Sequence, residues 1–557
     1  FTVVLILGGF TSKTVVAGTQ DYLQVDPVKM QWWTDARFGM FVHWGPVSLM
    51  GTEIGWSRAG ERRGRTGTGT IAMEVYDNLY RSFYPVEFNA QEWVELAQAA
   101  GMKYLVFTTK HHDGFCMFDS KLTDYTIMNS PFKRDVVKEL AEVCRAAGLR
   151  IGFYYSQPDW RHEDYRNSPE RHKRYIEYLH GHVRELLSNY GKIDIMWFDG
   201  LSGQAEDWDA DRLFKLVRSL QPEIIINNRC GLPGDFDTPE QRIGAFQTDR
   251  AWETCMTIGT QWAWKVNEEV KSLKQCLRTL IQVVGGDGNL LFNVGPMPTG
   301  TIEPRQAETL REMGRWLNKY GESIYKTRGG PFKPDWWGVS TYNGNRIYLH
   351  VLDWAGQDTF NLPAVNARVV NSRLLTGGEV AVKQDEEGIN ITVNPQDQQE
   401  LDTIVVLELD KQAKDILPVE RFSHSVATGK PAQASNVYRG RVETYGPDKA
   451  FDGLPGTRWA TDVDVSACWL EVNLETPMEI DRVIIDEAYG ERVRNFELQY
   501  RQGSQWTTFF KGTHIGVLKQ FSFPSIKAQH IRLNILEAIA GPTITEVELR
   551  GPKKDNR

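Results

Sequence analysis

Polar side chains stand at the ends of several apolar runs in this 557-residue chain. The clearest run is Ile193–Phe198, which is almost entirely apolar and ends in Asp199-Gly200. An apolar run of this length that is bounded by glycines is typical of a fully buried parallel strand. Ligands of parallel α/β folds bind at the carboxyl ends of strands, so Asp199 is the first candidate for a chemical role. The competing interpretation is a helix cap or loop anchor.

Further candidates follow the other apolar runs, and all carry groups that can hold, protonate or attack a ligand. They are His43 and Trp44, Lys110, His111, His112 and Asp113, Tyr155 and Ser156, Asn227, Asn228 and Arg229, Asp235, Asp237 and Glu240, and Glu253. In a parallel sheet these residues share one end. The set predicts glycoside hydrolysis by two carboxyl groups, in which one attacks the anomeric carbon and the other protonates the leaving oxygen. A carboxylate beside Arg229 keeps a low pKa and stays ionised, as a nucleophile must.

Two of these choices have alternatives. His111 and His112 could form a structural pair or ligate a metal ion, although adjacent strand residues point to opposite faces and do not easily share one ion. Glu253 could pair with Arg229 or Arg250 instead of acting on a substrate.

Strand-like and helical runs alternate from about residue 35 to residue 325, and they are the elements that would position these side chains. The strand-like runs are 39–45, 104–113, 150–156, 193–199, 223–229 and 289–295, and the helical runs are 90–100, 135–147, 169–190, 209–220, 270–284 and 304–320. Repeated βα units of this kind favour an α/β fold, a (β/α)8 barrel, over an open doubly wound sheet. No GxGxxG or Walker loop is present, which disfavours nucleotide binding.

The remainder of the chain reads as all β. We expect a catalytic barrel over 21–330, a small antiparallel β-sandwich over 331–412 and a third all-β unit over 413–557. The 64 basic and 72 acidic residues are spread along the chain and leave a net charge of −8, which argues against a nucleic-acid partner. The six cysteines form no CxxC pair, so no zinc or redox motif is predicted; distant disulfides stay open.

Residues 1–20 resemble a secretory signal peptide that lacks its basic start, and the alternative is an N-terminal tail of the mature protein. The first interpretation predicts a secreted or periplasmic protein. No other stretch approaches the ~20 apolar residues that span a bilayer, so we expect no membrane span.

Long motifs in the barrel region resemble the α-L-fucosidases of glycoside hydrolase family 29. They include WWTDARFGMFVHWG, MKYLVFTTKHHDGFCMFDS, IDIMWFDG, WETCMTI and GNLLFNVGP, and the resemblance covers about residues 30–325. It implies a retaining exo-acting enzyme that releases terminal α-L-fucose from oligosaccharides or glycoconjugates. It further implies a covalent fucosyl intermediate on Asp199 and no cofactor for catalysis.

The resemblance also implies which residues bind fucose: His43, His111, His112, Tyr155 and Arg229. The acid/base has no fixed motif in this family.

We favour Glu240, in the loop after the Asn-Asn-Arg segment, over Glu253 in the WETC motif. Many members have an adjacent Glu-Trp pair after the first strand. Here two residues lie between Glu53 and Trp56, and we carry both over as sugar contacts with that departure. The Gly- and Arg-rich insertion 59–70 is expected to shape the region beyond the fucose.

The third unit resembles discoidin-like modules (coagulation factor type C), whose fold is shared with family 32 carbohydrate-binding modules. KAFDGLPGTRWAT at 449–461 and ITEVELRG at 544–551 carry the resemblance. It implies a structural calcium ion held by Asp452, Thr457 and Glu546, an oxygen-only set that suits Ca²⁺. The alternative is a tight hydrogen-bonded turn without a metal.

The predicted partner is a fucosylated glycan, and the oligomeric state stays open. An attached module is frequent among family members that prefer α1,3- or α1,4-linked fucose, which makes that linkage our expectation. Two alternative functions stay open: a retaining glycosidase for another terminal sugar, and a non-catalytic glycan-binding protein.

Overall fold

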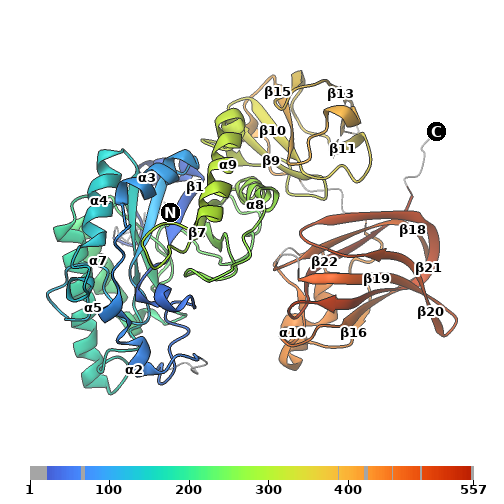
Figure 1. Ribbon diagram of the computed structural model, residues 1–557. Coiled ribbons are helices and arrows are strands. Elements are labelled where there is room, and N and C mark those ends of the chain that lie inside the picture. The colour runs from blue at the N-terminus through green and yellow to red at the C-terminus, as the bar shows by residue number, and fades with distance from the viewer. Residues whose placement is uncertain are drawn as a thin grey trace, which may run out of the picture.

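The computed structural model describes residues 22–63, 69–386, 388–419, 425–454, 456–489 and 492–552. Three units follow one another along the chain: a barrel, a β-sandwich and a second β domain (Figure 1). The segment 1–20, which resembles a signal peptide, lies outside the described residues. None of the described helices is long and apolar enough to cross a membrane.

A curled parallel sheet forms the first unit, with the strand order β5-β4-β3-β2-β1-β7-β6 in the described part of the chain. Its strands are β1 (Phe38–Val42), β2 (Tyr104–Lys110), β3 (Arg150–Ser156), β4 (Ile195–Asp199), β5 (Ile225–Ile226), β6 (Glu253–Thr257) and β7 (Asn289–Val294). Residues 236–240 fill the gap between the edge strands. Isolated bridges join this segment to both sides, at Asn227↔Phe236, Asp237↔Trp252 and Glu240↔Cys255. The predicted barrel is therefore confirmed, with an irregular segment at the eighth position.

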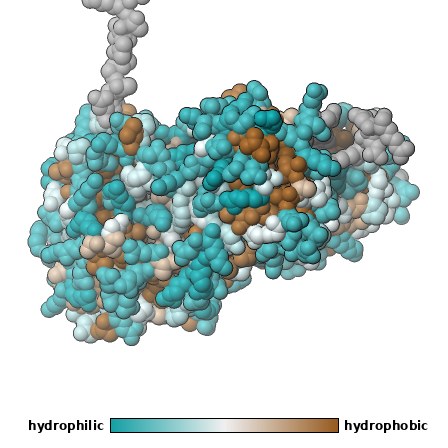
Figure 2. All heavy atoms as spheres, turned by 90° about the horizontal axis from the view of Figure 1, so that it is seen from above, coloured by the Kyte–Doolittle hydropathy of each residue, from teal (hydrophilic) through white to brown (hydrophobic). Residues whose placement is uncertain are grey.

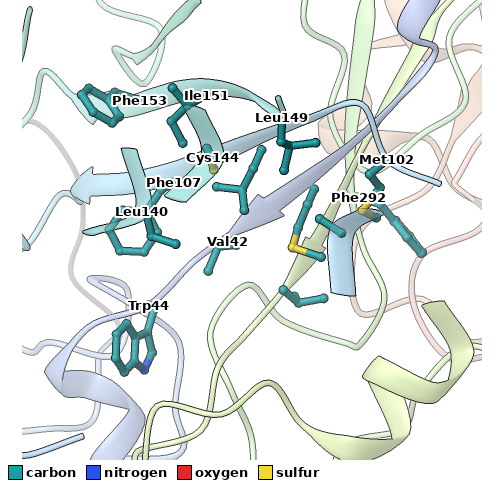
Figure 3. Packing of buried hydrophobic residues seen from close by; sticks show 14 of the residues in the cluster. Val42, Trp44, Met102, Phe107, Leu140, Cys144, Leu149, Ile151, Phe153 and Phe292 are labelled. Atoms are coloured by element: carbon teal, nitrogen blue, oxygen red, sulfur yellow. The ribbon is translucent and has the colours of Figure 1, made fainter. Parts of the chain in front are cut away.

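Helices cover the outer face of the sheet and bury their apolar stripes against it. They are α3 (Ala90–Ala99), α4 (Val136–Ala146), α5 (Pro169–Asn189), α7 (Ala210–Leu220), α8 (Leu273–Gly285) and α9 (Pro304–Tyr320), with the short α2 (Met73–Tyr76) and α6 (Ala205–Trp208) in loops. Figure 3 shows Leu140 and Cys144 of α4 beside Phe107 of β2 and Ile151 of β3. This packing fixes the strands, and with them the loops at the strand ends.

A second apolar cluster fills the inside of the barrel. Trp33 of α1 (Pro27–Ala36) packs there with Phe41, Tyr104, Tyr154 and Trp197 from the strands. Successive strand residues alternate between this inner cluster and the outer helix layer. The barrel is therefore a packed core, and α1 covers its amino end.

The second unit is the predicted antiparallel sandwich. One sheet has the order β12-β15-β10-β9-β8 and the other the order β11-β14-β13. The strands are β8 (Arg328–Gly329), β9 (Gly338–Asn343), β10 (Arg346–Val351), β11 (Thr359–Pro363), β12 (Val369–Leu374), β13 (Val380–Gln384), β14 (Gly388–Val393) and β15 (Thr403–Leu409). Val339 of β9 lies against Gly285 at the end of α8, where a Cβ on the glycine would be 2.3 Å from Val339 Cβ. The sandwich thus packs directly on the barrel.

The C-terminal unit is antiparallel and has a core of its own. Its strands are β16 (Ala432–Ala434), β17 (Trp459–Ala460), β18 (Cys468–Glu487), β19 (Val493–Gln502), β20 (Gln505–Gly512), β21 (Lys519–Ala538) and β22 (Thr543–Arg550), and α10 (Val442–Tyr445) lies in a loop. Seen from above, the molecule is largely hydrophilic with an apolar area near its middle (Figure 2).

Candidate active site

Asp199 is the last residue of β4, and its carboxylate meets groups from three other elements. Tyr154 of β3 donates a hydrogen bond to Asp199 Oδ2 at 2.9 Å. His112 Nε2 lies 3.6 Å from the same oxygen, and Arg229 Nη1 lies 3.4 Å from Oδ1. The residue is 8% exposed. The carboxyl ends of neighbouring strands thus surround one carboxylate.

The surroundings of Asp199 favour its charged form. Burial alone would raise its pKa, but the charge of Arg229, the nearby His112 and the Tyr154 hydroxyl outweigh burial, and the pKa is lowered. Asp199 is therefore ionised at neutral pH, which a nucleophile requires.

Glu240 reaches the same guanidinium from the irregular eighth segment. Arg229 Nη1 lies 2.8 Å from Glu240 Oε2 as well as 3.4 Å from Asp199 Oδ1. Arg229 is held by Thr238, whose hydroxyl accepts from Nε at 2.9 Å and whose carbonyl accepts from Nη2 at 3.1 Å, and its guanidinium stacks on Trp197 at 4.8 Å. The Glu240 side chain is 40% exposed, so it is open to solvent and to a ligand.

Glu253 lies at the other end of the barrel. It is the first residue of β6, opposite the first residue of β7 in a parallel pair. Its carboxyl group is 1% exposed and accepts hydrogen bonds from Tyr104 Oη at 2.5 Å and Trp197 Nε1 at 3.0 Å. Burial raises its pKa to about 7, against the effect of both hydrogen bonds. The structure therefore brings Glu240, and not Glu253, next to Asp199.

His111 and His112 both lie at the site because β2 ends at Lys110, earlier than predicted. Strand alternation no longer separates them, and their ring centroids are 4.1 Å apart. Ser156 Oγ lies 2.6 Å from His112 Nδ1 and fixes that ring. His111 Nδ1 is buried and has no hydrogen-bond partner in the described part of the chain. No group of three or more histidine, cysteine, aspartate or glutamate side chains that could hold a metal ion occurs among the described residues.

His43 follows β1 and is held by Asn293 Oδ1, 2.7 Å from its Nδ1. Burial lowers its pKa to about 4, with a smaller opposing effect from Asn293 and Asp199. Burial, followed by the neighbouring His112, also lowers the pKa of His111 well below its usual value. Both imidazoles are neutral at pH 7, so each can donate one hydrogen bond and accept another.

The prediction for Tyr155 is wrong, because its side chain points away from the site. Its hydroxyl lies 3.0 Å from His182 Nδ1 of α5, and the ring belongs to the outer helix layer. Tyr154 occupies the inner face instead and bonds Asp199. Strand alternation forces this choice. The register could have revealed it, since Tyr154 pairs with Trp197, two residues before Asp199.

Glu53 fixes the loop that carries Trp262 by hydrogen bonds to its backbone. Its carboxylate accepts hydrogen bonds from the backbone N–H groups of Ile54 at 2.9 Å, Trp262 at 2.8 Å and Ala263 at 3.1 Å. Trp262 in turn lies against His43, with ring centroids 4.8 Å apart. Glu53 therefore positions Trp262 instead of facing a sugar. Sequence reasoning missed Trp262, and its only signal was an indole inside a polar loop.

Trp56 packs edge-on against His112, with centroids 5.7 Å apart, and against Trp160 at 5.0 Å. It therefore lies beside the histidine that approaches Asp199.

The three residues proposed for calcium lie together in the C-terminal unit. Thr457 Oγ1 donates to Asp452 Oδ1 at 2.8 Å, and Gly453 N donates to Glu546 Oε2 at 3.0 Å. The carbonyl of Leu454 lies 2.9 Å from Thr457 Oγ1. The cluster is made of oxygen atoms, which fits a hard cation.

The chain is similar in sequence and fold to known proteins. Residues 12–322 match the family Alpha-L-fucosidase, and residues 431–548 match the F5/8 type C domain. Human plasma alpha-L-fucosidase is 30% identical over 386 residues, which cover 62% of this chain and 82% of that protein. Among solved structures, alpha-L-fucosidase isoenzyme 1 from Paenibacillus thiaminolyticus is 37% identical at a TM-score of 0.63, covering 69% of this chain and 99% of that one.

A family 29 alpha-L-fucosidase from Bacteroides thetaiotaomicron, solved as a trapped covalent intermediate with 2-fluoro-fucosyl fluoride, is 26% identical at a TM-score of 0.61; the match covers 69% of this chain and 96% of that one. The family match spans more than half of the 557 residues and contains the whole barrel. The chain therefore belongs to the alpha-L-fucosidase family of retaining glycoside hydrolases and carries a C-terminal F5/8 type C domain.

Proposed function

We propose that this enzyme is an exo-acting α-L-fucosidase that works through a covalent fucosyl–Asp199 intermediate, with Glu240 as its acid/base. Asp199 bonds to the anomeric carbon while the glycosidic C–O bond breaks, and Glu240 donates its proton to the leaving oxygen. Glu240 then removes a proton from water, the water oxygen attacks the anomeric carbon, and Asp199 leaves as a carboxylate. Two inversions return α-L-fucose.

The observation that carries this proposal is the shared guanidinium of Arg229. Contacts of 3.4 Å to Asp199 and 2.8 Å to Glu240 from one nitrogen limit the separation of those two oxygens to about 6 Å. Retaining glycosidases separate their carboxyl groups by about 5–5.5 Å, and inverting ones by about 6.5–9.5 Å. The trapped covalent intermediate of the Bacteroides relative further supports the covalent step.

Neutral imidazoles and an indole are suited to bind the sugar. His43 and His111 can exchange hydrogen bonds with ring hydroxyls, and the unpartnered Nδ1 of His111 favours such a role. The apolar ring of Trp262 beside His43 suits the methyl group of a 6-deoxy sugar. That apolar wall favours fucose over a terminal sugar with a hydroxymethyl group.

The decisive test is the first-formed product. Hydrolysis of an aryl α-L-fucoside, followed by NMR, should release α-L-fucose before mutarotation, and Asp199→Ala should lower kcat at least about 10³-fold. Release of β-L-fucose first would refute retention. No release from aryl fucosides and fucosylated oligosaccharides would instead leave a glycan-binding protein.

We propose a preference for α1,3- and α1,4-linked fucose, which the attached C-terminal module supports. A release assay on defined α1,2, α1,3, α1,4 and α1,6 fucosides tests it, and faster release of α1,2- or α1,6-linked fucose would refute it. Secretion or export to the periplasm stays a prediction.

We also propose a structural Ca²⁺ ion held by Asp452, Thr457 and Glu546, supported by their clustered oxygens. Adding Ca²⁺ after chelation should raise the melting temperature of the C-terminal domain in the wild type and not in Asp452→Ala.

A further inference from the structure

Four arginines and three tyrosines from separate loops meet at one end of the C-terminal domain. Ring contacts connect them in a chain that runs from Arg439 through Tyr438 to Tyr445, and from there through Arg458 to Tyr489 and Arg492, with Arg441 also over Tyr445. We call this set the arginine–tyrosine cluster. It draws on residues 438–445, on 458, on 489 and on 492, so no basic block appears in the sequence.

Each guanidinium of the cluster lies over an aromatic ring. Arg458 Cζ is 5.2 Å from the ring centroid of Tyr445 and 5.5 Å from that of Tyr489. Arg492 lies 4.6 Å from Tyr489. Stacking holds a guanidinium flat and leaves its N–H edge available for a planar acceptor.

Two acids lie beside the cluster, but their carboxylates bond its backbone: Asp462 Oδ1 accepts from Arg439 N at 2.8 Å, and Glu487 Oε1 accepts from Arg492 N at 2.9 Å. Within the described residues, none of its four guanidiniums lies within 4.0 Å of a carboxylate oxygen, although the whole chain has a net charge of −8. Arg492 Nη1 donates to the carbonyl of Gly541 at 2.9 Å, and Arg458 Nε is buried with no partner in the described part of the chain. Arg439 and Arg441 are exposed.

We propose that the arginine–tyrosine cluster binds an anionic glycan, one that carries sulfate esters or carboxylates. Charge-assisted, bidentate hydrogen bonds from arginine suit both groups, and the tyrosine rings and hydroxyls offer contacts to a sugar face and its hydroxyls. The site would hold an acidic polymer while the barrel releases fucose from it. In Figure 1, α10 of the cluster and α2, in a loop at the carboxyl end of the barrel, both lie on the lower side of the molecule.

An anionic membrane is the competing partner, because exposed aliphatic side chains lie nearby. Val442, Val463 and Ile539 are 55%, 76% and 67% exposed. The glycan is favoured because the barrel of the same chain belongs to a family that acts on glycans, and because tyrosines, not aliphatic residues, separate the arginines.

The test uses the full chain with Asp199→Asn, so that binding is read without turnover. Affinity electrophoresis is run through gels that contain a sulfated galactan, polygalacturonate or neutral dextran. We expect retardation by at least one of the two anionic polymers, little by dextran, and loss of retardation in 1 M NaCl. The polymer that retards identifies sulfate or carboxylate as the bound group.

Matched variants separate the cluster from general charge. Arg458→Gln/Arg492→Gln should weaken binding at least tenfold, whereas Lys511→Gln/Lys527→Gln, which removes the same charge from exposed positions of the same domain, should change it less than twofold. Arg439→Gln/Arg441→Gln, at exposed positions, gives a second variant if the first pair unfolds. Equal binding by cluster and control variants would overturn the proposal. So would equal retardation by dextran, or binding to phosphatidylserine vesicles and to neither polymer.

Hydrolysis of an aryl fucoside by the cluster variants should stay within twofold of wild type. A failure of this proposal therefore leaves the proposed catalytic function untouched.

Discussion

At the scale of single residues, two glutamates have opposite surroundings. Glu240 touches Arg229 and is half open to water, whereas Glu253 is enclosed by Tyr104 and Trp197 at the amino end of the barrel. A residue that gives and takes a proton in each turnover must reach the leaving oxygen beside the nucleophile, and of these two glutamates only Glu240 shares Arg229 with Asp199.

We therefore expect Glu240→Gln to lower kcat on a fucosylated oligosaccharide by roughly 100-fold or more, because the leaving oxygen loses its proton donor. Glu253→Gln should change kcat/KM by less than about tenfold. Steady-state kinetics on the oligosaccharide and on a dinitrophenyl fucoside check this, since a good leaving group needs less protonation and should suffer a smaller loss in Glu240→Gln. Azide should restore turnover of the dinitrophenyl fucoside in Glu240→Ala. A larger loss in Glu253→Gln would reverse the assignment.

The raised pKa of Glu253 predicts how the free energy of unfolding changes with pH. Burial raises its pKa from 4.5 to about 7 in the folded protein. Between these values the unfolded chain has released the proton while the folded chain keeps it, so stability falls as pH rises through this window. The full contribution, present below pH 4.5, is at most about 3 kcal/mol.

Urea unfolding followed by tryptophan fluorescence from pH 5 to 8 measures the effect. The glutamine in Glu253→Gln stays neutral at every pH. The free energy of unfolding of this variant should therefore increase relative to that of the wild type as pH rises. A difference between the two proteins that is constant over this range would show that Glu253 does not titrate there.

At the scale of elements, apolar runs predicted the strands and helices of the barrel. A buried strand or helix needs apolar residues at a characteristic spacing and over a characteristic length, and both can be read from the sequence. Local irregularities escaped prediction. Nothing in the sequence showed that β2 ends at Lys110, or that residues 236–240 bridge two edge strands and so carry Glu240 to the site. Likewise, which of Tyr154 and Tyr155 faces the inside of the barrel depends on the register between β3 and β4.

The insertion after β1 fastens two loops of the site. Arg63 Nη1 donates to the carbonyls of His162, Glu163 and Tyr165 at 2.6, 2.7 and 2.8 Å. Arg62 is buried between Trp56 and Trp160, 5.6 and 4.9 Å from their centroids. The insertion thereby joins the loops after β1 and β3 beside His112.

Arg63→Met should loosen the contact between the loops after β1 and β3, because three backbone carbonyls lose the group that donates hydrogen bonds to them. We expect KM for a fucosylated oligosaccharide to rise at least about fivefold and KM for an aryl fucoside to change less, because the insertion is predicted to shape the region beyond the fucose. Lys173→Met, an exposed change on α5, is the matched control. Equal effects on both substrates would place the insertion at the fucose itself.

At the scale of the whole molecule, the C-terminal domain is nearly independent of the rest. Its apolar core contains no residue from the barrel or the sandwich. Among the described residues, one ion pair joins it to the sandwich, between Lys519 and Asp353, and both side chains are partly exposed. An exposed pair of this kind contributes about 0–1 kcal/mol. The Paenibacillus relative, nearly all of which is matched, covers 69% of this chain, so the remaining part is not needed for an alpha-L-fucosidase fold.

A chain that ends after Val419, whose backbone pairs with Phe332 of the sandwich, should therefore fold, melt within a few degrees of the barrel transition of the full chain, and hydrolyse an aryl fucoside with a kcat/KM within about twofold. The full chain should show a second calorimetric transition, which the shortened chain lacks, because separate cores unfold separately. Release of fucose from an insoluble acidic glycan should fall in the shortened chain, since the domain no longer raises the local concentration of substrate. A single transition in the full chain, or aryl-fucosidase activity lost on truncation, would mean that the two parts depend on each other beyond the Lys519–Asp353 pair.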